Sequence, residues 1–244
     1  DIVFIGIIWR HGDRAPSNLP YPLDINIESS WPRGWKQLTN EGILQMYDLG
    51  QWIRNRYVIQ STHIKPVFDH KERALTSAQA VMAGLFTPDT TDIWKRGLAW
   101  QPTPIHSNGD HRDDPNTGMT IDATNVDDLY DIHREIQHGL PQPSWVTDEL
   151  VDKIIELKRQ HEGTLSSLMY AMGVGNDQLI PYAAAIIIEL HKDNDKEYVQ
   201  LWYRNETTTT TNTPFQLTIP KCTMDCPLST FNQLMSPIVI KSME

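Results

Sequence analysis

Arg10, His11 and Arg14 lie close together in the stretch RHGDRAP. Each guanidinium can donate paired hydrogen bonds to phosphate oxygens. A histidine between them could attack phosphorus in line while the arginines neutralise charge on the equatorial oxygens. The alternative is that these side chains only form ion pairs with Asp13 and its neighbours. Seven specified positions that follow an apolar run favour phosphoryl chemistry over that alternative.

The residues around the motif indicate how it is positioned. The apolar run Ile2–Trp9 is typical of a buried parallel strand. The motif then stands at the carboxyl end of that strand, where open α/β sheets bind their ligands. Helical spacing of apolar residues predicts two helices, over 39–57 with Thr39 as a cap and over 72–85.

The rest of the chain divides into a polar region and a second group of elements. The stretch 87–139 is rich in Pro, Asn, Asp and His, which predicts loops, short turns and a small cap. An amphipathic helix is expected over 147–159. Further along we expect a hairpin, a short strand and a short helix, over 183–203, 215–219 and 231–235 respectively.

Composition excludes several classes of function. The chain has 244 residues and a net charge of -10, which argues against non-specific binding to nucleic acid or to an anionic membrane. No apolar run approaches the ~18 residues of a membrane span. Because the surface is acidic, a phosphate site must be a local positive pocket. The chain begins at Asp1, and we interpret it as mature or trimmed.

The two cysteines, Cys222 and Cys226, allow three interpretations. They could be reduced thiols, or part of a zinc site, although a structural zinc site needs four ligands. They could also form a short-loop disulfide, which requires an oxidising compartment. The sequon that begins at Asn205 would fit that compartment and predicts a glycan on a surface loop.

Several stretches resemble the histidine acid phosphatases, most closely the lysosomal and prostatic type. They are RHGDRAP, SSWPRGWKQLTNEGILQMYDLGQWIRNRY, ERALTSAQAVMAGLF, WQPTPIH, LPQPSW, GNDQLIPYAAAIIIEL, YRNET and the CxxxCPL tail. They span nearly the whole chain in the family's order. The resemblance implies an α/β fold of the phosphoglycerate-mutase kind. Its parallel-centred sheet would be sandwiched by helices and carry a small, mainly helical or loop cap.

The resemblance also implies roles for individual residues. His11 would be the nucleophile, phosphorylated and then hydrolysed by water, and Arg10 and Arg14 would bind the phosphate. The family's later His-Asp pair aligns best with His161 and Glu162, so His161 would bind phosphate and Glu162 would protonate the leaving oxygen. These two residues could instead simply end the preceding helix. No metal and no cofactor are implied.

The chain departs from the family in three places. Val67 stands where the family has a further phosphate-binding Arg. The segment between the 147–159 helix and His161, which would include a central strand, has no counterpart. The polar stretch 107–137 is shorter than the family's cap and lacks its cysteines. We therefore expect a single domain over 1–244, with a reduced cap insertion at about 87–145.

The sequence is compatible with two functions. The first is an acid phosphatase, secreted or lysosomal, that acts on a small phosphomonoester or a phosphoprotein and could pair as a homodimer. The second is an impaired or inactive secreted relative that acts as a binding or antigenic protein. A phosphoglycerate mutase or a phytase would share the RHG chemistry. We expect the remaining histidines of the polar region to be solvated, namely His106, His111, His133 and His138.

Overall fold

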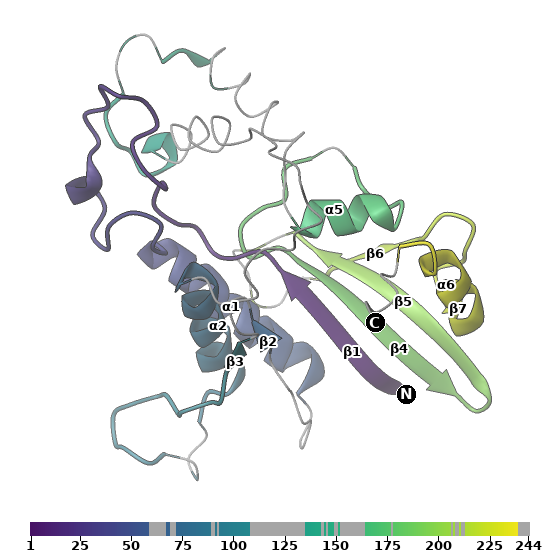
Figure 1. Ribbon diagram of the computed structural model, residues 1–244. Helices are drawn as coiled ribbons and strands as arrows, with labels where there is room; N and C mark the ends of the chain where they lie inside the picture. Colours follow the sequence, from purple (N-terminus) through teal and green to yellow (C-terminus); the bar gives the residue numbers. More distant parts are fainter. Residues whose placement is uncertain are drawn as a thin grey trace, which may run out of the picture. The chain divides into compact units, whose positions relative to one another are not determined.

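The computed structural model divides into two compact units (Figure 1), which we name the sheet unit and the motif unit. The sheet unit comprises Asp1–Arg10, Glu162–Glu206 and Thr213–Glu244, and the motif unit comprises His11–His161 and Thr207–Asn212. Within them the structure describes residues 1–58, 67–68, 72–88, 91, 93–107, 135–142, 144, 146–148, 151, 164–176, 178–205, 207, 210 and 213–238.

The sheet unit is built on a five-stranded sheet of order β1-β4-β5-β6, with β7 also paired to β5. Every strand pair in this sheet is antiparallel. The strands are β1 (Ile2–Trp9), β4 (Ala185–Asp193), β5 (Lys196–Arg204), β6 (Phe215–Leu217) and β7 (Cys226–Pro227). The predicted hairpin is therefore confirmed as β4 and β5.

The prediction of a buried, parallel-centred sheet is wrong for the described strands. β1 has the predicted bounds, but it pairs antiparallel with β4 and is an edge strand of the sheet. Phe4 is 61% exposed. A continuous apolar run is typical of parallel strands because these are usually buried on both faces, but it does not determine the direction of the neighbouring strand. The tight β4–β5 turn, with Asn194 at φ +53°, can join only antiparallel strands.

Two helices cover one face of the sheet, α5 (Thr164–Ala171) and α6 (Leu228–Met235). Their apolar side chains join those of β4 and β5 in one buried cluster. It contains Leu165, Met169, Met172, Ile180, Ala184, Ile186, Leu201, Tyr203, Ile219 and Met235. No residue of β1 belongs to this cluster, so β4 and β5 carry the core of the sheet unit.

The motif unit contains the two predicted helices, α1 (Asn40–Tyr57) and α2 (Glu72–Leu85), which pack along each other. The predicted cap is confirmed, because Oγ1 of Thr39 accepts a hydrogen bond from the backbone N–H of Gly42 at 3.0 Å. Also in this unit are a 3₁₀ turn, η1 (Glu28–Ser30), and a parallel pair of two-residue strands, β2 (Val67–Phe68) and β3 (His106–Ser107).

Side chains of α1 satisfy the carboxyl end of α2. Nε2 of Gln51 donates to the carbonyl oxygen of Gly84 at 2.6 Å, and a guanidinium nitrogen of Arg54 donates to that of Leu85 at 2.8 Å. The last carbonyls of a helix have no partner within the helix. These contacts therefore fix the two helices lengthwise as well as side by side.

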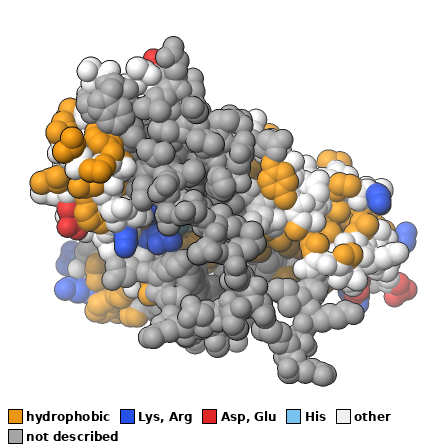
Figure 2. Space-filling model, turned by 45° about the horizontal axis from the view of Figure 1, so that its top comes forward, with side chains coloured by type: hydrophobic (Ala, Val, Ile, Leu, Met, Phe, Trp, Pro, Cys, Tyr) orange, Lys and Arg blue, Asp and Glu red, His pale blue; other side chains and the backbone are white. Residues whose placement is uncertain are grey.

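The segment between the motif and α1 has an inverted pattern of burial. Asp24 and Asn26 are buried, whereas Leu23, Ile25 and Ile27 are 88%, 63% and 53% exposed. Figure 2 shows hydrophobic side chains gathered on part of the surface. The side-chain amide of Asn26 donates to Oε2 of Glu135 at 2.9 Å, and Oδ1 of Asp24 accepts from the backbone N–H of Asn26 at 2.8 Å, which holds the segment in this orientation.

Cys222 and Cys226 form the disulfide, so the third interpretation of the cysteines is confirmed. Most of the expected 147–159 helix and most of the 87–139 region lie outside the described residues. Among the described residues, no helix has both the length and the apolar character needed to cross a membrane.

Candidate active site

His11 is partly buried and its ring is oriented by the motif itself. Nδ1 of His11 lies 2.7 Å from the carbonyl oxygen of Gly12. A carbonyl can only accept, so Nδ1 is the protonated nitrogen. In the neutral ring the lone pair is then on Nε2. Nε2 is the atom that can attack an electrophile such as phosphorus.

The motif turn rests directly on the first turn of α1. A Cβ atom added at Gly12 would lie 2.2 Å from the carbonyl oxygen of Gly42, and one added at Gly42 would lie 1.9 Å from that of Asp13. No side chain fits at either position without moving backbone. These two glycines therefore let the nucleophile loop and the start of α1 pack against each other.

Asp13 is the buried centre of a hydrogen-bond network. Its Oδ2 accepts from Oγ1 of Thr39 at 2.6 Å, and its backbone N–H donates to Oε1 of Gln45 at 3.0 Å. The N–H of the preceding Gly12 lies 3.4 Å from Oγ of Ser77 in α2. The motif is thus tied to both helices of its unit.

Arg14 is 8% exposed and is held by its own loop. One guanidinium nitrogen donates to the carbonyl oxygen of Ala15 at 2.8 Å and to Oγ of Ser17 at 3.3 Å. Its backbone forms an isolated bridge with Leu38. These contacts restrict the guanidinium, so less conformational entropy is lost when it binds an anion.

Arg10 belongs to the sheet unit, as the residue that follows β1. Its backbone N–H donates to the carbonyl oxygen of Ala184 at 2.9 Å, and its guanidinium donates to that of Ile180. The guanidinium also lies over the ring of Tyr182, 4.6 Å from the centroid. The segment that leads into β4 therefore positions Arg10.

His138 was expected to be solvated, and that expectation is wrong. Its Nε2 donates to Oδ2 of Asp13 at 2.6 Å, and its ring meets Trp31 edge-on at 5.2 Å between centroids. The hydrogen bond to Asp13 raises the pKa of His138, with smaller contributions from the charges of Asp13 and Glu41, while burial opposes the shift. The two partners are 125 positions apart. Local sequence gives no signal for such a contact.

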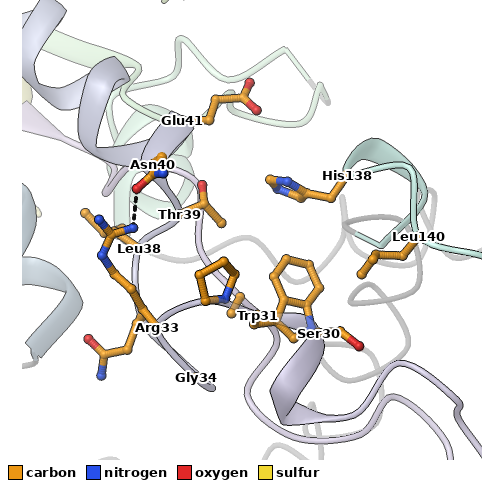
Figure 3. Close-up of a pocket in the computed structure, with 13 residues that line it drawn as sticks. Ser30, Trp31, Arg33, Gly34, Leu38, Thr39, Asn40, Glu41, His138 and Leu140 are labelled. Atoms are coloured by element: carbon orange, nitrogen blue, oxygen red, sulfur yellow. Dashed lines mark hydrogen bonds between the residues drawn. The ribbon is translucent and has the colours of Figure 1, made fainter.

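A pocket of about 220 Å³ adjoins this network. Figure 3 shows the imidazole of His138 between the indole of Trp31 and the side chain of Glu41, with Arg33 hydrogen-bonded to Asn40 at the other side. The lining is Ala15, Ser30, Trp31, Pro32, Arg33, Gly34, Gln37, Leu38, Thr39, Asn40, Glu41, His138 and Leu140. Its wall therefore includes Ala15 of the motif.

Asp13, Glu41 and His138 bring potential metal-ligating atoms within 4.8 Å of one another. However, Oδ2 of Asp13 and Nε2 of His138 are only 2.6 Å apart. Two ligands at about 2 Å from one tetrahedral ion would stand more than 3 Å apart. The arrangement fits a hydrogen bond rather than a metal centre.

The structure brings together only part of the expected site. His11 and Arg14 share one unit and Arg10 is fixed in the other. His161 and Glu162 lie outside the described residues. Val67 is described as part of β2, without its side chain.

A family model matches residues 1–146, the part that contains the motif, α1 and α2. It is the histidine phosphatase superfamily, branch 2. The chain belongs to this family.

Among the relatives of this histidine phosphatase are two mammalian enzymes. Prostatic acid phosphatase of Rattus norvegicus is 28% identical over 342 aligned positions, which cover 98% of this chain and 87% of the relative. Lysosomal acid phosphatase of Bos taurus is 28% identical over 334 positions, with coverage of 98% and 78%. Because this histidine phosphatase has 244 residues, roughly a hundred aligned positions of the rat relative face a gap here.

The fold of this histidine phosphatase is similar to that of solved bacterial phytases. The phytase of Citrobacter braakii superposes with a TM-score of 0.62 at 14% identity, covering 98% of each chain. The phytase of Klebsiella sp. ASR1 gives a TM-score of 0.60 at 11% identity, covering 97% of this chain and 93% of that one. At these identities the similarity concerns the fold alone.

Proposed function

We propose that this chain hydrolyses phosphate monoesters through a phosphohistidine on His11. The observation that carries the proposal is the hydrogen bond from Nδ1 of His11 to the carbonyl of Gly12. It fixes the tautomer whose Nε2 is nucleophilic. Family membership and acid phosphatase relatives support the same reaction and do not favour the inactive binding protein.

In the first step Nε2 of His11 attacks phosphorus and the bond from phosphorus to the ester oxygen breaks. Arg10 and Arg14 bind the nonbridging oxygens and stabilise their charge as the bond breaks. The leaving oxygen takes a proton from Glu162, and His161 supplies a further contact to phosphate. We place the organic part of the substrate in the pocket that adjoins the motif.

In the second step a water molecule attacks the phosphohistidine. The carboxylate of Glu162 now accepts a proton from that water, the N–P bond breaks, and inorganic phosphate leaves. The acid of the first step is the base of the second, which restores the starting state. Protonated Glu162 is needed to begin the cycle, so the reaction is favoured by acid.

Hydrolysis of a chromogenic aryl phosphate at about pH 5 tests the proposal. We expect His11→Ala to abolish turnover and Glu162→Gln to lower kcat more for poor leaving groups than for good ones. His191→Gln is the matched control, because His191 forms a similar histidine–carboxylate pair with Glu189 in the sheet unit. Equal turnover by His11→Ala and the parent chain would refute the proposal.

We further propose that the protein is secreted or lysosomal, with a glycan on Asn205 and a pairing of two copies as a homodimer. The disulfide and the prostatic and lysosomal relatives support the compartment. The substrate is then a small phosphomonoester or a phosphoprotein met outside the cytosol. Glycosidase treatment of the natural protein and light scattering test the glycan and the dimer.

A further inference from the structure

One contact in the motif unit is unexplained by the reaction above. His138 reaches Oδ2 of Asp13 from a segment 125 positions away, and Asp13 is the only acid in RHGDRAP. Oδ2 also accepts from Thr39, the cap of α1. His138 therefore contacts Asp13, the residue that links the nucleophile loop to α1.

The segment that carries His138 is anchored a second time. Glu135 is fully buried, and its Oε2 accepts from the side-chain amides of Asn26 and Gln142, each at 2.9 Å. The amide of Asn26 also donates to the carbonyl oxygen of Pro141 at 3.0 Å. These bonds hold residues 135–142 against the segment that follows the motif, so His138 is presented from a fixed backbone.

The contact with His138 can compensate the buried negative charge of Asp13. Asp13 is 3% exposed, and its Oδ1 is buried with no hydrogen-bond partner among the described residues. A buried carboxylate without compensation is costly. It would also repel a phosphate dianion and compete for Arg14. Protonated His138 supplies a compensating charge at 2.6 Å.

We propose that His138 is a positioning residue for the reaction, which neutralises Asp13 and so holds the His11–Arg14 loop in its phosphate-binding form under acidic conditions. This inference rests on the proposed function. His138 does not touch the reacting atoms in this account. It acts through Asp13.

The direction of the pH effect follows from the groups that face His138. Asp13 and Glu41 favour the protonated ring, and Trp31 contributes only an aromatic edge. Arg33 lines the same pocket and is hydrogen-bonded to Asn40. The pKa of His138 is raised above 6.5, so the charge is complete below 6.5 and is lost as the pH passes the raised pKa.

A double-mutant cycle on the pH profile of kcat/KM tests the inference. His138→Gln keeps an amide donor but loses the charge, and we expect it to lower kcat/KM about tenfold at acidic pH. The alkaline limb of the profile should lose the ionisation of His138. In an Asp13→Asn background the same change should cost about twofold or less, because the two residues act together. His191→Gln should leave the profile unchanged.

Equal losses in both backgrounds, or an unaltered profile in His138→Gln, would overturn the inference. If the parent chain shows no hydrolysis, the proposed function fails, and calorimetric titration with inorganic phosphate takes its place. The inference then predicts that raising the pH from about 5 to 8 weakens phosphate binding more in the parent chain than in His138→Gln. The same pH dependence in both would refute it.

If His138→Gln does not fold, a second measurement can still test the inference. NMR titration of the histidine ring protons can compare the parent chain with Asp13→Asn. We expect one ring to titrate above 6.5 in the parent and to move down in Asp13→Asn. On its alkaline side, the parent's profile should show that ionisation in addition to the loss of the proton on Glu162. A parent profile without that ionisation, or a ring that titrates alike in both chains, would contradict the inference.

Discussion

Gly12 shows that the motif depends on backbone contact as well as on its charged side chains. A methyl group at this position would meet the carbonyl oxygen of Gly42 at 2.2 Å. We expect Gly12→Ala to destabilise the protein by about 2 kcal/mol or more and to remove phosphatase activity, because the motif turn must move away from α1. Urea unfolding and the aryl phosphate assay measure the two effects.

Gly6→Ala is the control for that prediction. It adds the same methyl group in β1, where the nearest neighbour is the flexible ring of Phe4 at 3.4 Å. We expect a change of less than about 1 kcal/mol. A Gly12→Ala protein as stable and active as Gly6→Ala would mean that the glycine contact does not hold the motif.

At the level of residues, the sequence predicted what is local and missed what is distant. RHGDRAP and the Thr39 cap are contiguous patterns whose chemistry or geometry can be recognised without the fold. His138 lies 125 positions from its partner in a polar stretch, so its composition suggested only a solvated loop. Its role depends on tertiary contacts.

Thr39 joins an element to the site, because it both caps α1 and donates to Asp13. We expect Thr39→Ala to cost about 1 kcal/mol for the cap. The buried carboxylate also loses a charge-assisted hydrogen bond, worth about 1.5–3 kcal/mol. Thr39→Ser keeps the hydroxyl and should recover most of both. Thermal unfolding measures the stability of the two variants. Equal stability of Thr39→Ala and Thr39→Ser would mean that the hydroxyl of Thr39 does not stabilise the protein.

The sheet offers a matched pair of isoleucines for a second element-scale prediction. Ile186 of β4 is fully buried, whereas Ile8, its cross-strand neighbour in β1, is 39% exposed. We expect Ile186→Ala to cost about 2–5 kcal/mol and Ile8→Ala about half of that or less. Equal costs in urea unfolding would place β1 in the interior.

The elements were predicted better than their pairing. Hydrophobic periodicity and turn residues locate strands and helices, and β1, α1 and α2 begin and end close to where these patterns place them. Strand direction depends on which strands are neighbours. The apolar run of β1 is compatible with a parallel partner, and its antiparallel pairing with β4 has no local signature.

At the scale of the whole molecule, the raised pKa values of Glu135 and His138 make stability depend on pH. Burial raises the pKa of Glu135 to about 7, and its ordinary value is 4.5. Protonation of Glu135 therefore contributes fully to the free energy of unfolding below pH 4.5, and this contribution is lost as the pH rises to about 7. The free energy of unfolding then falls by at most about 1.4 kcal/mol per pH unit. His138 acts in the same direction above pH 6.5. We expect the free energy of unfolding to fall from pH 5 to neutrality.

Glu135→Gln tests that prediction, since the amide cannot lose a proton. Urea unfolding across this pH range should show a flatter dependence than in the parent chain. Glu197→Gln, which alters an exposed carboxyl of β5, is the control and should keep the parent's slope. If the free energy of unfolding of Glu135→Gln depends on pH as steeply as that of the parent chain, groups other than Glu135 cause the pH dependence.

Trapping the intermediate tests whether His11 carries the phosphoryl group. The protein is mixed with excess aryl phosphate, quenched in alkaline denaturant within the first turnover, digested, and examined by mass spectrometry for a phosphorylated peptide. We expect a phosphoryl group on His11 that appears during turnover and is absent from His11→Ala. Turnover accompanied by a phosphoryl group on another residue, or by none at all, would contradict it.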